Sequence, residues 1–160
     1  MTTDPGILTK LSAMTREGEW PDSYLEHEVV RNSPGQPVLP CVLYVDGVRT
    51  TRRDGVIGFW VYNLVSMKRL LVAMLRKSEL CGCGCRGWCS INMVWLLISW
   101  SLRSMIEGRY PTTRHDGTPF AVGADDHREA LKGNEFGWKA ILLFVKADLA
   151  EYGATMGLPS

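Results

Sequence analysis

The sequence has little that would place the protein in a membrane or outside the cell. Its longest apolar run, residues 91–100 with a weak continuation to Leu102, contains Asn92 and Ser99. That run is well short of the roughly 20 apolar residues that a membrane span needs. Residues 1–20 contain several charged side chains and no long apolar segment, so a secretory signal is not expected. We therefore expect no membrane partner and an intracellular location, including the nucleus.

Histidine is scarce, and the number of cysteines is odd. The chain has 5 cysteines and 3 histidines. An odd number of cysteines without a sign of export gives no support for a disulfide framework. The thiols are therefore expected to be free or bound to metal.

The length and composition are those of one globular domain. Of the 160 residues 46% are apolar and 22% are charged, so the chain can form a core and long disordered segments are not expected. We expect peripheral N-terminal helices in residues 1–36. Residues 37–160 would then form one α/β core, with a cysteine-rich insert at residues 81–89.

The net charge of +1 conceals an uneven distribution of charge. Residues 49–114 hold eleven basic and three acidic side chains, a net charge of +8, whereas both flanking segments are net acidic. A basic face of this kind could bind the phosphates of nucleic acid, with Arg49, Arg52 and Arg53 as candidate contacts. Alternatively, these charges only solvate strand ends and helix faces.

Hydrophobic patterning predicts a mixture of helices and short strands. A strand, then a helix, then another strand favours a parallel pair within a mixed sheet. The helix that begins at Ser90 is apolar nearly all round, which is typical of a buried helix. The expected helices are residues 7–14, 21–31, 90–107, one turn near 126–131, and 148–156; the expected strands are 41–45, 56–64, 68–75 and 139–146, the second and third forming a hairpin.

Four cysteines lie within nine residues, at positions 81, 83, 85 and 89. Zinc prefers four thiolates in a closed tetrahedral site, and the intervening glycines allow the backbone to curl around the metal. A structural zinc bound by Cys81, Cys83, Cys85 and Cys89 is the favoured interpretation. His115 is a further candidate ligand, and His27 or Cys41 could also contribute. The alternatives are thiols without metal or an adventitious disulfide.

Two aspartates follow apolar strands. Asp46 follows residues 41–45 and Asp148 follows residues 141–145. Sites in open α/β sheets gather at the carboxyl ends of strands, and paired carboxylates can hold the Mg²⁺ or Mn²⁺ ions of phosphodiester cleavage. Glu151 could add a third ligand from the same helix face as Asp148. Alternatively, Asp46 belongs to an Asp-Gly turn and Asp148 caps the last helix.

The pair His115 and Asp116 is a weaker candidate. It could bind metal or position a phosphate, but Asp116 precedes Gly117, and Asp-Gly is typical of a turn.

Several segments resemble a large multicopy family of uncharacterised proteins in dinoflagellate genomes. The resemblance covers roughly residues 38–159 and is most specific at the cysteine motif. The segments that resemble the family are LYVDGV (43–48), GFW (58–60), LRK (75–77), CGCRGWCS (83–90), RHDG (114–117) and KADLAEY (146–152).

That family in turn resembles cut-and-paste transposases with an RNase H-like core. The resemblance implies an RNase H-like mixed sheet in which Asp46 and Asp148 hold catalytic metals. The third carboxylate of such cores lies on a later helix, so we expect this chain to be truncated, with Glu151 as a substitute. We therefore expect a transposase-derived domain that processes DNA, or its inactive remnant. The alternative is a non-catalytic, zinc-stabilised module that binds nucleic acid or protein.

Overall fold

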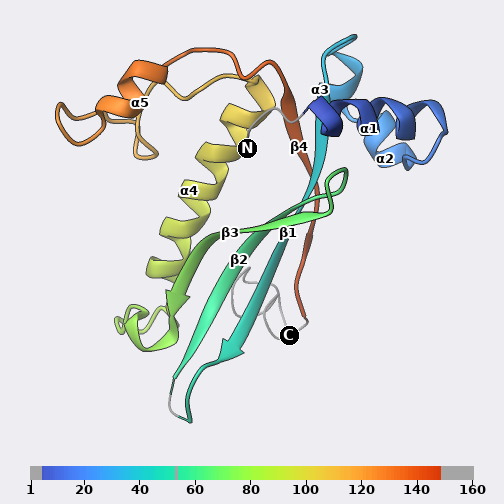
Figure 1. Cartoon of the computed structure of the whole chain (residues 1–160). Helices are drawn as coiled ribbons and strands as arrows, with labels where there is room; N and C mark the ends of the chain where they lie inside the picture. Colours follow the sequence, from blue (N-terminus) through green and yellow to red (C-terminus); the bar gives the residue numbers. More distant parts are fainter. Residues whose placement is uncertain (1–4, 53, 149–160) are drawn as a thin grey trace.

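The computed structural model describes residues 5–52 and 54–148. It contains a four-stranded open mixed sheet in the order β3-β2-β1-β4, with a long helix against it (Figure 1). The elements are α1 (Pro5–Arg16), α2 (Asp22–Leu25), α3 (Glu28–Arg31), β1 (Val38–Arg49), β2 (Gly55–Asn63), β3 (Lys68–Arg76), the 3₁₀ turn η1 (Lys77–Glu79), α4 (Trp88–Glu107), α5 (Asp126–Leu131) and β4 (Lys139–Lys146).

Strands β1, β2 and β3 form an antiparallel meander. The expected hairpin of β2 and β3 is confirmed, and Asn63 shapes its turn by accepting hydrogen bonds from the N–H groups of Val65 and Ser66. The expected end of the first strand at Asp46 is wrong. Strand β1 continues to Arg49, and Asp46 pairs with Gly58. Asp46 is therefore a strand residue and not part of an Asp-Gly turn, because the longer β1–β2 ladder outweighs the local turn preference.

The parallel pair expected from the strand-helix-strand order is present. Strand β4 lies beside β1 and runs parallel to it, from the Val38–Lys139 pair to the Tyr44–Lys146 pair. Ile141 is fully buried where these strands meet. Burying the apolar side chains of β1 and β4 against α4 stabilises this long-range pairing.

Helix α4 begins earlier than its sequence indicates. The expected start was Ser90 acting as the cap, but the cap is Gly87, in the left-handed conformation (φ 86°). The Ser90 hydroxyl instead accepts a hydrogen bond from the N–H of Cys81. At the other end Gly108, at φ 73°, stops the helix, as expected.

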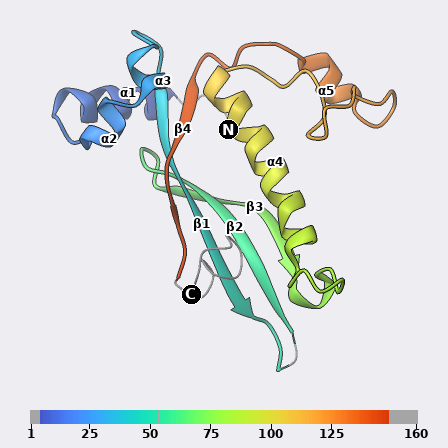
Figure 2. The ribbon, with the colours of Figure 1, turned by 180° about the vertical axis from the view of Figure 1, so that it is seen from behind.

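The expectation that α4 is buried all round is wrong. Helix α4 lies along one side of the sheet (Figure 2). One of its faces joins the core through Ile91, Val94 and Ile98, whereas Met93 and Leu96 are about half exposed. Among the described residues, α4 alone has the length and apolar composition that could cross a membrane. Core helices of soluble proteins meet the same criterion.

The N-terminal segment folds as three helices. The single helix expected at residues 21–31 is divided into α2 and α3, because His27 leaves the helical conformation and caps α3. Leu11, Trp20 and Tyr24 join the main core, and the Tyr24 hydroxyl donates a hydrogen bond to the carbonyl of Val38. The N-terminal helices are thus attached to the first residue of β1.

Candidate metal centre

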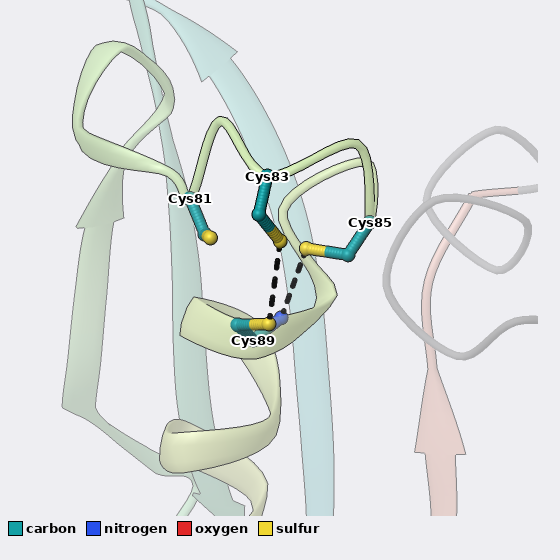
Figure 3. Close-up of side chains that lie close together, drawn as sticks. All are labelled: Cys81, Cys83, Cys85 and Cys89. Atoms are coloured by element: carbon teal, nitrogen blue, oxygen red, sulfur yellow. Dashed lines mark hydrogen bonds between the residues drawn. The ribbon is translucent and has the colours of Figure 1, made fainter.

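The four clustered cysteines converge in space. Their sulfur atoms all lie within 4.8 Å of one another, and the Sγ atoms of Cys83 and Cys89 are 3.8 Å apart (Figure 3). A zinc–sulfur bond of about 2.3 Å places the sulfurs of a tetrahedral site about 3.8 Å apart. A disulfide would require about 2.05 Å. The four thiols are therefore unpaired and could together hold one metal ion.

Left-handed backbone conformations curl this loop. Gly84, Arg86 and Gly87 all have positive φ, at 92°, 55° and 86°. A Cβ at Gly87 would lie 3.0 Å from a methyl carbon of Leu80, so this position has little room for a side chain. Cys89 lies in the first turn of α4, whereas the other three cysteines lie in the loop before it (Figure 3). The loop thus brings three sulfurs over the amino end of a helix.

The pKa values of the clustered thiols are shifted in different directions. The N–H of Cys89 donates to the sulfur of Cys85 at 3.4 Å, and with a further hydrogen bond from Cys83 it lowers the pKa of Cys85 to about 6. Hydrogen bonds with Cys85 and then Cys83 raise the pKa of Cys89 to about 12. The pKa of Cys83 is also raised, first by its hydrogen bond with Cys81. Cys85 therefore loses its proton readily, and its negative charge disfavours the loss of a proton from the other thiols. A bound cation would neutralise this charge and favour the thiolate form of all four.

The other candidate ligands lie outside this cluster. Cys41 is buried in β1, where burial raises the pKa of its thiol to about 11. His27 accepts the N–H of Val29 through Nδ1. His115 is exposed in a turn in which Asp116 accepts hydrogen bonds from Thr118, as its Asp-Gly sequence indicates. Within residues 5–52 and 54–148, the four cysteines are the only group of three or more metal-binding side chains.

The two aspartates expected at a catalytic site both lie just beyond the last pair of the parallel β1–β4 ladder, Asp46 within β1 and Asp148 after β4. Asp46 and Asp148 each follow the Tyr44–Lys146 pair of the parallel strands by two residues. The Tyr44 hydroxyl donates a hydrogen bond to Asp46 at 2.9 Å. That bond is the main cause of the raised pKa of Tyr44, and the charge of Asp148 adds to it. Glu151 lies outside the described residues.

Sequence patterning missed Tyr44 as the partner of Asp46. The signal was present, because residues two apart on a strand share a face. It was obscured because the strand was expected to end before Asp46.

Two of the three candidate phosphate contacts lie at one end of the sheet. Arg49 and Arg52 line a shallow cleft of about 530 Å³ with Lys77 and Ser78. Asp54 links the β1–β2 connection to the residues that follow β3. It accepts hydrogen bonds from Ser78 and forms an ion pair with Arg76 at 3.1 Å. Arg53 lies outside the described residues. The contribution of Lys77 was not expected, because it comes from a segment distant in sequence.

No protein family model, no curated protein and no solved structure matches this chain. What the chain can do therefore follows from its own residues and geometry.

Proposed function

We propose that this protein is a transposase-derived, RNase H-like domain that handles DNA and performs metal-dependent phosphodiester chemistry when active. The observation that carries the proposal is the register of β1 and β4. Asp46, within β1, and Asp148, just after β4, each follow by two residues the last pair of this parallel ladder, at its carboxyl-side end. Ligands of α/β sheets gather at such ends, and paired carboxylates can share Mg²⁺ or Mn²⁺.

The order of elements supports the same proposal. Three antiparallel strands are followed by a helix and by a fourth strand parallel to the first. This agrees with the order expected from the resemblance to RNase H-like transposases. Asp46 lies on β1 and Asp148 lies just after β4, which are the positions that the resemblance gives to the metal-binding carboxylates.

Basic side chains near this end supply contacts for a phosphate backbone. Arg49 and Arg52 line the cleft at the β1–β2 connection, while Arg69 and Lys146 line a second cleft with Tyr44. Phosphate neutralisation by such side chains gives binding that weakens steeply with salt. In the proposed function these clefts hold the backbone on either side of the carboxylates.

The cysteine cluster has a structural part in this proposal. Zinc is the metal we assign to it, because thiolates at tetrahedral spacing suit zinc and four protein ligands leave no open position for substrate. The bound ion would fix the connection between β3 and the amino end of α4. It would thereby hold α4 against the sheet.

A second candidate function is a zinc-stabilised interaction module without catalysis. It is favoured by the exposed apolar side chains of β3 and α4, which include Leu71, Met74 and Met93. In that case Asp46 and Asp148 would have no metal to bind, and the apolar surface would take a partner.

Nicking of supercoiled DNA with Mg²⁺ or Mn²⁺ tests the first function. Asp46→Asn and Asp148→Asn are expected to abolish nicking. Glu107→Gln, which neutralises an exposed carboxylate at the end of α4, is the matched control and should retain it.

The remaining outcomes separate the alternatives. DNA binding without nicking, with affinity that falls as salt rises, would identify an inactive remnant. Zinc-dependent folding with neither nicking nor DNA binding would favour the interaction module.

A further inference from the structure

Strand β3 has the side-chain pattern of an interior strand although it lies at an edge. Its residues 70–75 read LLVAML, an unbroken apolar run. Runs of this kind are typical of strands buried on both faces, whereas a half-exposed strand alternates apolar and polar side chains. Four of these side chains are 43% to 57% exposed: Leu70, Leu71, Val72 and Met74.

The exposed edge of β3 is a site where another strand can pair. Among the described strands, β3 has one neighbour, β2, so its other side is unpaired. Edge strands are usually protected by inward-facing charge, proline or a covering segment, and the run at 70–75 contains neither charge nor proline. The bulge opposite Phe59 and Trp60 leaves Val72 without a partner on β2 but does not interrupt the pairing on either side. An added strand would place its own side chains beside the apolar side chains on each face of β3.

One residue of β3, Val72, lines a cavity. It has a volume of about 280 Å³ and lies between the sheet and α4, with Leu43, Val61 and Ile98 among its buried lining. Val72 of β3 and Leu97 of α4, which are 43% and 37% exposed, also line it. An apolar side chain from an added strand could therefore reach the cavity between β3 and α4.

The charges at the ends of β3 indicate what kind of strand would pair there. Lys68 and Arg69 precede the apolar run, and Arg76 follows it. Arg76 is already matched by Asp54 at 3.1 Å and by Glu79 at 3.6 Å. The end of β3 that holds Lys68 and Arg69 therefore favours an acidic partner.

A second copy of this chain fits poorly. An antiparallel alignment that superimposes the two apolar runs would place Arg69 opposite Arg76 and Lys68 opposite Lys77, at both ends. Like charges directly opposite each other destabilise strand pairing.

We propose that β3 binds an extended apolar segment of another protein by strand addition, with carboxylates of that segment opposite Lys68 and Arg69. Main-chain hydrogen bonds along β3 would supply affinity, and the cavity lined by Val72 and Leu97 would select an apolar side chain. This binding site does not involve Asp46 or Asp148, but it shares Arg69 with the second cleft of the proposed function.

A pair of labelled peptides tests the proposal on the full-length, zinc-loaded protein. The acidic probe has alternating valine and threonine followed by two aspartates, the order that brings the carboxylates opposite Lys68 and Arg69 in antiparallel pairing, and the basic probe has lysines in place of the aspartates. The acidic probe should bind at least about tenfold more tightly. The double variant Lys68→Glu, Arg69→Glu should reverse that preference, because it reverses the charge that meets the probe. The matched control is Lys10→Glu, Arg16→Glu on α1, which should leave the preference unchanged.

Hydrogen exchange locates the bound probe. The acidic probe is expected to slow the exchange of the amides of residues 70–75. A probe with proline at alternate positions should not slow it, because this probe lacks the N–H donors that strand pairing needs. Three results would overturn the proposal: no slowing at these amides, dimers that form through β3, or binding to phosphatidylserine vesicles that the acidic probe does not inhibit. The charge variants change exposed side chains and do not depend on replacing apolar residues of the fold.

Discussion

The cysteine loop and the strand-end carboxylates are assembled in opposite ways. All four sulfurs come from residues 81–89, and local left-handed turns bring them together. Asp46 and Asp148 are about a hundred residues apart in the sequence, and only the pairing of β4 with β1 brings both of them to the same end of the parallel ladder. A local site depends on the conformation of a few residues. A long-range site depends on the stability of the whole sheet.

The largest expected effect is the loss of the zinc ion that we propose for the local site. Cys89→Ser should prevent stable zinc binding, because it removes one of the four proposed ligands and the only one of them that belongs to α4 itself. We expect the free energy of unfolding to fall by several kcal/mol, since structural zinc binding contributes roughly 10 kcal/mol or more in zinc-finger peptides. Zinc content and thermal unfolding, with and without a chelator, measure this.

Cys41→Ala is the control for that experiment. It should leave zinc content unchanged, because Cys41 lies in the core away from the cluster. Loss of zinc in Cys41→Ala would contradict the four-cysteine site.

The next largest effect should fall on the long-range site. Ile141→Ala removes a fully buried side chain at the β1–β4 contact and should cost about 3 kcal/mol of folding stability. Zinc affinity should change by less than about tenfold, because the cysteine loop does not depend on that contact. Denaturant unfolding and zinc titration of the same variant compare the two. If zinc affinity fell by as much free energy as folding stability does, the conformation of the cysteine loop would depend on the sheet and not on local residues alone.

A smaller effect is expected from the turn that closes the loop. Gly87→Ala places a side chain at φ 86° and within 3.0 Å of Leu80. A left-handed alanine costs roughly 1–2 kcal/mol, so zinc affinity should fall by about tenfold. Gly82→Ala is the matched control, because a Cβ there meets nothing within 4 Å and its φ is not left-handed. Zinc competition with a chromogenic chelator distinguishes the two variants, and equal affinities would argue against strain at residue 87.

The smallest effect is a change in one tyrosine pKa at the long-range site. The pKa of Tyr44 is raised mainly because its hydroxyl donates to Asp46, so Asp46→Asn should lower this pKa toward the usual tyrosine value. The phenol would then ionise at a lower pH, because a neutral acceptor no longer opposes the phenolate. The absorbance of tyrosinate during alkaline titration, compared with Tyr44→Phe, measures it. Tyr24, whose pKa burial raises to about 12, should be unaffected.

Prediction from the sequence succeeded where the signal was local. The four-cysteine group, the β2–β3 hairpin, the range of β4 and the end of α4 at Gly108 all follow from nearby residues. It failed at Asp46-Gly47, where ladder pairing with Gly58 and Ile57 outweighed a turn preference. It also failed on α4, because an apolar composition does not say how many neighbours are available to cover a helix.

The sequence by itself determined the cysteine cluster and most of the helices and strands, because periodicity, glycines and turn residues act over a few positions. The tertiary structure decided which strand lies beside β1, which face of α4 is covered, and that the apolar strand β3 has an unpaired edge in the described part of the chain. These depend on how much apolar surface each packing arrangement buries, and that quantity is set by contacts between residues far apart in the sequence.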